Sequence, residues 1–147
     1  LAACQHTAPI PPQAPPQQVE TGSTFTLFTP LAFSPTATEL LFQNQRIVGA
    51  QALVRNVPYC RLAPQVGAPR AIAPGNLTVT GVTYDERESG SSGSMLSITR
   101  IALAVAANQP GYVLTCGWPE ASAAPAFVTT EQIFDAISGQ FTMELLR

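Results

Sequence analysis

The residues best suited to chemistry in this chain are its three cysteines, Cys4, Cys60 and Cys116. Cysteine sulfurs form disulfides in oxidising compartments, and as thiolates they bind metals or act as nucleophiles. The chain has no CxxC spacing and its only histidine is His6, so it lacks the usual ligand set of a zinc site. We expect Cys60 and Cys116 to pair in an oxidising compartment; two buried free thiols or a metal pair are the alternatives.

Catalytic side chains are scarce elsewhere in the sequence. Because the chain has a single histidine, most schemes of general acid–base catalysis and of nucleophile relay are excluded. The serine-rich stretch Gly90–Ser94 has no base nearby in sequence, so it indicates a hairpin turn rather than a nucleophile elbow. We therefore expect no catalytic residues, no cofactor and no enzyme activity.

One acidic cluster, Asp85, Glu86 and Glu88, surrounds Arg87. In a strand, Glu86 and Glu88 lie on one face, where such a pair could bind Ca²⁺ or act as an acid and a base. The cluster lacks the ligand count of a calcium loop. The simpler interpretation is a solvated hairpin end, and we expect no metal site.

Tyr112 and Trp118 share one face of a predicted strand with Cys116. Aromatic rings stack on sugars, so the two side chains could line a glycan-binding face. The alternative interpretation places both in the core beside the sulfur. Aromatic residues make up only 7% of the chain, which weakens the glycan interpretation.

Three consecutive strands would position these residues, and the sequence predicts them at Leu77–Glu88, Met95–Ala107 and Tyr112–Pro119. The stretch Ser89–Ser94 predicts the turn between the first two. The apolar positions change face at Gly81 and again between Ile98 and Ile101, which indicates β-bulges and a bent hairpin.

A helix is predicted near the end of the sequence. Thr129 and Gln132 have the spacing of a capping box, which predicts a short helix over Glu131–Ser138 that ends at Gly139. Its apolar stripe would consist of Ile133, Phe134 and Ile137.

Short strands and loops complete the prediction. Asn44-Gln45 predicts a tight hairpin turn. The other predicted strands are Phe25–Phe28, Glu39–Gln43, Arg46–Val48, Gln51–Asn56, Tyr59–Leu62 and Gln140–Leu146, with loops over Leu31–Thr38 and Ala63–Gly75. Residues 19–147 therefore predict a mainly β fold. We expect a compact antiparallel sandwich or barrel-like domain of about seven short strands with one short C-terminal helix.

The first four residues, Leu1-Ala2-Ala3-Cys4, resemble the lipobox of bacterial lipoproteins. The resemblance covers these four residues, and it implies that Cys4 carries the lipid and becomes the first residue of the mature protein. No signal peptide precedes the motif in this numbering, so we expect it to lie outside. Gln5 stands where an Asp is associated with inner-membrane retention in that family, so the resemblance implies the outer membrane.

Residues 1–18 combine this motif with a proline- and glutamine-rich tether. Residues 8–18 hold five of the fourteen prolines, which favour extended polyproline II structure. The segment is either a linker or a peptide docked on a neighbouring subunit. In the second case Pro11, Pro12, Pro15 and Pro16 would make the contacts with the partner.

Composition narrows the classes of partner. Charged residues make up 11% of the chain, against roughly 25% in an ordinary soluble domain. The seven basic residues are scattered arginines and the net charge is −2, so we expect no nucleic-acid partner. No apolar run approaches the ~20 residues of a membrane span.

Two functions follow as expectations from these observations. The first is an outer-membrane-anchored lipoprotein that acts as a structural or accessory subunit of a bacterial cell-envelope assembly. Its partners would be other envelope subunits, together with the membrane reached through the lipid. The second is a secreted or surface ligand-binding β module of the glycan-binding type.

Overall fold

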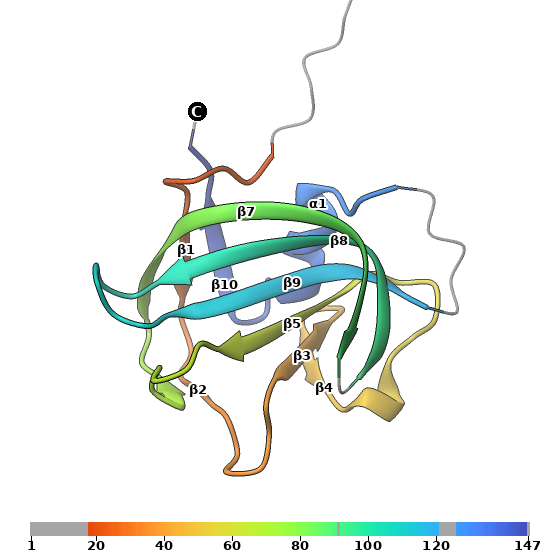
Figure 1. Ribbon diagram of the computed structural model, residues 1–147, viewed down its shortest axis with the longest axis horizontal. Coiled ribbons are helices and arrows are strands. Elements are labelled where there is room, and N and C mark those ends of the chain that lie inside the picture. Colours follow the sequence, from red (N-terminus) through yellow and green to blue (C-terminus); the bar gives the residue numbers. More distant parts are fainter. Residues whose placement is uncertain (1–17, 91, 121–125, 147) are drawn as a thin grey trace, which may run out of the picture.

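The structure is a computed structural model, and it describes residues 18–90, 92–120 and 126–146. These residues form a mainly β fold with a curled antiparallel sheet and one short helix near the C-terminus, as the sequence predicted (Figure 1). The strands in chain order are β1 (Thr24–Leu27), β2 (Leu31–Ala32), β3 (Leu40–Gln43), β4 (Arg46–Val48), β5 (Tyr59–Pro64), β6 (Ala71–Ile72), β7 (Gly75–Gly90), β8 (Gly93–Ala104), β9 (Tyr112–Pro119) and β10 (Phe141–Glu144). A 3₁₀ turn spans Ala50–Ala52, and helix α1 spans Thr130–Ile137.

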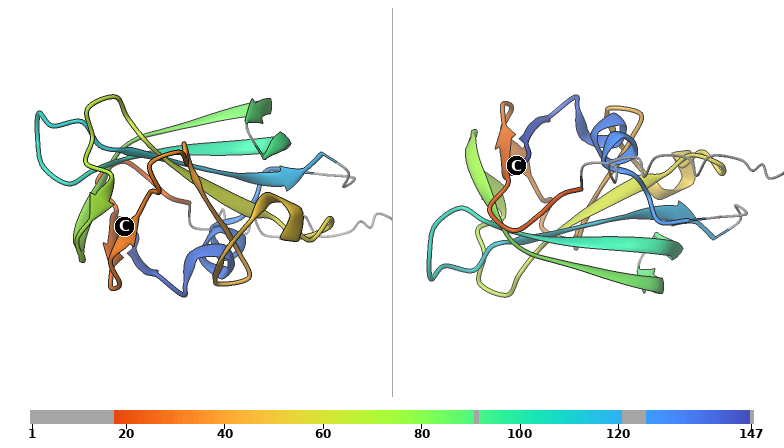
Figure 2. Two further views of the ribbon diagram at one scale, coloured as in Figure 1. Left: turned by 90° about the horizontal axis from the view of Figure 1, so that it is seen from below. Right: turned by 90° about the horizontal axis from the view of Figure 1, so that it is seen from above.

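Eight of these strands form one sheet in the order β10-β1-β7-β8-β9-β5-β3-β4, and β2 pairs with β6 in a separate ladder. All the pairings are antiparallel. Strands β7, β8 and β9 form one layer, and α1 lies on the other side of the core (Figure 2). The sheet therefore curls around the helix in a barrel-like arrangement.

The end of α1 lies against the β3–β4 turn, at one end of the strand order, and leads into β10, at the other end. Gln45, in the turn between β3 and β4, donates its backbone N–H to the carbonyl oxygen of Ala136 at 3.1 Å. A Cβ on Gly139 would lie 2.0 Å from the carbonyl oxygen of Gln45, so only glycine fits there. Gly139 does not adopt a positive φ, and the helix ends in an αR Ser138. The helix therefore stops just before Gly139, as predicted, and the glycine is needed there for the close approach of the Gln45 backbone.

The core fills the space between the curled sheet and α1. Phe141 packs edge-on against Phe25 and Phe42, with ring centroids 6.4 and 6.0 Å apart. Ile133 and Ile137 face this core, as predicted, but Phe134 is exposed and Ala136 takes its place. The small Ala136 is favoured because the β3–β4 turn approaches the helix backbone at this residue.

Strands β7 and β8 form the long bent hairpin that the sequence predicted. Their register shifts between Val79 and Gly81, where the sequence placed a bulge. A second shift, in the pairing of β8 with β9, lies between Leu96 and Thr99, at Ser97 with a φ of 50°. The predicted position, after Ile98, was two residues too late. The hairpin turn is also tighter than predicted, because Gly90 and Gly93 pair directly.

Two other local predictions differ from the structure. Gln51–Asn56 forms no strand; the chain makes the 3₁₀ turn at Ala50–Ala52 and continues without regular pairing. The predicted loops contain the short strands β2 and β6, which pair only with each other. Two-residue ladders of this kind depend on contacts distant in sequence, so no local pattern marks them.

Candidate functional site

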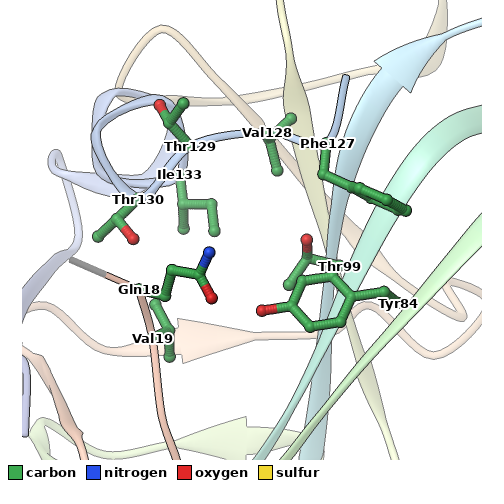
Figure 3. Close-up of a pocket in the computed structure, with 9 residues that line it drawn as sticks. All are labelled: Gln18, Val19, Tyr84, Thr99, Phe127, Val128, Thr129, Thr130 and Ile133. Carbon is green, nitrogen blue, oxygen red and sulfur yellow. The ribbon is translucent and has the colours of Figure 1, made fainter. Parts of the chain in front are cut away.

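A pocket opens between the β7–β8 hairpin and the beginning of α1, and its volume is about 450 Å³. The walls come from four parts of the chain: the residues before β1, the middle of β7 and β8, the segment before α1 and the first turns of α1 (Figure 3). The lining residues are Gln18, Val19, Tyr84, Thr99, Phe127, Val128, Thr129, Thr130 and Ile133. No charged side chain is among them, so the pocket favours uncharged and mainly apolar groups.

The capping box places the helical wall of the pocket. The Oγ1 atom of Thr129 accepts the backbone N–H of Gln132 at 3.1 Å, and the Gln132 side chain accepts the backbone N–H of Thr129 at 2.8 Å. This arrangement confirms the motif read from the sequence. Because it fixes where α1 begins, it also fixes Thr130 and Ile133 at the pocket.

Two aromatic rings stand together at the pocket. Tyr84 and Phe127 meet edge to face with ring centroids 5.4 Å apart. Both remain exposed, at 49% and 44% of their surface, and because their rings touch they form a small apolar patch rather than isolated surface residues. Tyr84 reaches the concave face of the sheet because the bulge at Gly81 reverses the facing of later residues in β7.

Thr99 provides a buried polar group in the pocket wall. It lies on β8, just beyond the second register shift, opposite Tyr84 on β7 and Cys116 on β9. Its side chain is 3% exposed, and its hydroxyl has no hydrogen-bond partner among the described residues. In Figure 3 this hydroxyl points into the space between the lining side chains.

The disulfide expected from the sequence is confirmed. Cys60 on β5 and Cys116 on β9 are direct partners in the ladder, with an S–S distance of 2.07 Å. Both cysteines are buried in the core that faces α1. Within the described residues no group of three or more His, Cys, Asp or Glu side chains could hold a metal ion.

The acidic cluster is largely engaged in ion pairs. Glu88 accepts from Arg61 at 2.6 Å and also pairs with Arg100. Asp85 lies 3.5 Å from Arg100. Arginine side chains therefore pair with two of the three carboxylates at the hairpin end, and Glu88 is only partly exposed, less solvated than the sequence suggested.

Tyr112 lies in the core, as the second sequence interpretation stated, and Trp118 is partly buried and packs against it. Tyr112 is buried, its ring stacks on Phe33, and its hydroxyl donates to the carbonyl oxygen of Pro69. Burial raises the pKa of the Tyr112 hydroxyl above its ordinary value. Trp118 packs partly against the core and donates its indole N–H to the carbonyl oxygen of Ala126 at 3.0 Å. These two residues form no open platform for a sugar.

Sequence reasoning missed the pocket residues themselves. The facing of Tyr84 followed from the predicted bulge, but nothing local indicated that Phe127, 43 positions later in the printed sequence, would meet its ring. Two sequence predictions lie outside the described residues: lipidation at Cys4, and partner contacts at Pro11, Pro12, Pro15 and Pro16.

Comparison of the chain with protein-family models, with curated proteins and with solved structures finds no match. In the described part of the chain no helix has the length and apolar character needed to cross a membrane. The fold and the site therefore define the class: a disulfide-linked, curled β domain with an uncharged pocket beside its helix.

Proposed function

We propose that this protein is an outer-membrane lipoprotein, anchored through Cys4, that serves as an accessory subunit of a bacterial envelope assembly. The observation that carries the proposal is the Cys60–Cys116 disulfide. Disulfides persist in oxidising compartments and are rare in the cytoplasm. Because the domain uses two of its three cysteines for this bond, Cys4 is left for another purpose, and it stands in the lipobox-like sequence Leu1-Ala2-Ala3-Cys4.

The composition supports the assembly role. The low share of charged residues suits a surface that is partly covered by neighbours or held at a membrane. The segment that follows Cys4 is rich in proline, a composition that favours a role as a spacer between an anchor and a domain. A diacylated and N-acylated Cys4 gives stable anchoring, whereas a single acyl chain binds only marginally.

Intact-mass spectrometry of the protein isolated from its native membrane tests the anchor. The expected mass begins at Cys4 and includes the acyl chains, and the protein partitions into the detergent phase. A Cys4→Ser variant loses both properties, while the neighbouring Gln5→Ser variant keeps them. An unmodified chain that still carries Leu1-Ala2-Ala3 contradicts the proposal.

Chemical cross-linking in intact cells tests the assembly role. Replacing Pro11, Pro12, Pro15 and Pro16 by serine is expected to abolish cross-linked species of defined mass while leaving the protein in the membrane. The matched control replaces Gln13 and Gln17 by serine in the same segment and is expected to keep those species. If no discrete cross-linked species forms with the wild-type protein, the assembly role is wrong.

No structural observation favours the glycan-binding alternative at the residues first considered for it. Tyr112 is buried and its hydroxyl is bonded to Pro69, and the Trp118 indole N–H is bonded to Ala126.

A further inference from the structure

We propose that the pocket beside α1 binds a small, uncharged aromatic molecule that carries one hydrogen-bond acceptor, and that the Thr99 hydroxyl donates to this acceptor. The proposal concerns a ligand site in the domain, and it is independent of the anchoring through Cys4. It rests on three features of the pocket: its buried hydroxyl, its uncharged lining and its pair of exposed aromatic rings.

The unpartnered hydroxyl is the strongest of these observations. A buried donor without a partner destabilises a protein, because the group has lost its hydrogen bonds to water without replacement. A valine has nearly the same shape as threonine, so packing alone does not require a hydroxyl at position 99 on the strand. The Oγ1 atom of Thr99 points into the pocket, where an acceptor atom of a bound molecule would complete its hydrogen bond (Figure 3).

The lining determines the charge and size of the ligand. Since no charged side chain lines the pocket, a charged group placed inside it would lose its hydration without compensation. Val19, Val128 and Ile133 supply an apolar floor. A volume of about 450 Å³ lies within the roughly 300–1,000 Å³ range of pockets that hold small organic ligands. A sugar, with hydroxyls on every side, would leave most of them unpaired here.

The aromatic pair favours a flat ring as the body of the ligand. Tyr84 and Phe127 already adopt an edge-to-face geometry, and both rings retain exposed surface. A third aromatic ring that packs against them would bury this surface and gain further ring–ring contacts.

Two probes that differ in one acceptor test the proposal on the full chain: 2-acetylnaphthalene, a neutral ketone, and 2-ethylnaphthalene, which has a similar shape but no carbonyl. Binding is followed by ¹H–¹³C methyl spectra. We expect both probes to shift the methyl signals of Val19, Val128 and Ile133, and the ketone to bind about 5-fold more tightly, the factor for ~1 kcal/mol.

Substitutions then separate the hydrogen bond from the packing. Thr99→Val is expected to weaken binding of the ketone about 5-fold and to leave the affinity for the hydrocarbon unchanged. Thr115→Val is the matched control, because Thr115 is also a buried threonine, on β9, but does not line the pocket. Gln18→Trp, at an exposed residue of the pocket lining, should obstruct the pocket and abolish binding of both probes, whereas Thr21→Trp, at an exposed residue outside the pocket, should not.

Several results would overturn the proposal. These are the absence of binding in the folded wild-type chain, methyl shifts outside the pocket, equal affinity for ketone and hydrocarbon, equal effects of Thr99→Val and Thr115→Val, or binding that survives Gln18→Trp. Binding that appears only when Pro11, Pro12, Pro15 and Pro16 are all replaced by serine would identify the occupant as the chain's own N-terminal segment. That result would also overturn the proposal.

Discussion

At the scale of single residues, Tyr112 makes the free energy of unfolding depend on pH in the alkaline range. Its hydroxyl is buried and donates to Pro69, and burial raises its pKa above the ordinary value of about 10. Tyr112 is protonated in both the folded and the unfolded chain at neutral pH. As the pH rises past about 10, the unfolded chain loses this proton first, so the free energy of unfolding falls.

We predict that Tyr112→Phe costs about 1 kcal/mol at neutral pH, because it removes the hydrogen bond to Pro69. It also removes the ionisable group, so the difference between wild type and variant narrows above pH 10. Urea unfolding between pH 7 and 11 measures both effects. A stability difference that stays constant over this range would contradict the raised pKa.

The Arg61 side chain contacts the tip of the long β7–β8 hairpin. Its side chain is 4% exposed, and it pairs with Glu88 near the end of β7. A Cβ on Gly90 would lie 1.7 Å from Nη1 of Arg61. The same guanidinium is buried and pairs with Glu88 through Nη2, so moving Nη1 away from a Cβ at position 90 would disturb this ion pair.

Gly90→Ala is therefore predicted to destabilise the domain by about 1–3 kcal/mol in urea unfolding. Gly81→Ala is the matched control in the same strand, because no atom lies within 4 Å of its added Cβ and its φ is not positive. Gly81→Ala should change stability by less than about 0.5 kcal/mol. Equal losses in the two variants would show that the contact with Arg61 does not matter.

At the scale of elements, the capping box of α1 fixes where the helix begins beside the pocket and contributes to the stability of the domain. We predict that Thr129→Ala lowers the free energy of unfolding by about 1 kcal/mol, because the N–H of Gln132 loses its acceptor. Thr129→Ser keeps the oxygen and should remain close to wild type. Thermal unfolding by circular dichroism compares the variants, and a serine variant as unstable as the alanine variant would show that the cap is not the cause.

The elements also show which parts of the structure the sequence could predict. The Asn44-Gln45 turn, the bulge at Gly81 and the helix cap were all predictable, because each depends on a few neighbouring residues. Both turn residues indeed have positive φ, at 53° and 69°. The pairing of β2 with β6 and the exposure of Phe134 depend on contacts distant in sequence, so no local pattern specified them.

At the scale of the whole molecule, the candidate site results from the curvature of the sheet. The two register shifts bend β7 and β8, and the backbone contact between Gly139 and Gln45 sets the end of α1 against the β3–β4 turn. The pocket lies between these two fixed parts. The sequence predicted a mainly β domain of sandwich or barrel-like form and the helix cap, but the contact of Tyr84 with Phe127 required the complete three-dimensional arrangement.

The disulfide is the covalent constraint on this arrangement, and it supplies the last prediction. It joins neighbouring strands whose cysteines are 56 positions apart, so on the chain-entropy model it stabilises the fold by roughly 4 kcal/mol. We predict that replacing Cys60 and Cys116 by alanine lowers the free energy of unfolding by about 2–5 kcal/mol.

Both sulfurs are buried, so dithiothreitol should reduce the native bond only as fast as the domain opens. Cys4→Ser, which leaves the bond intact, should unfold like the wild-type chain. A double variant as stable as Cys4→Ser would mean that strand pairing alone holds β5 against β9, and the bond would then serve no purpose in folding.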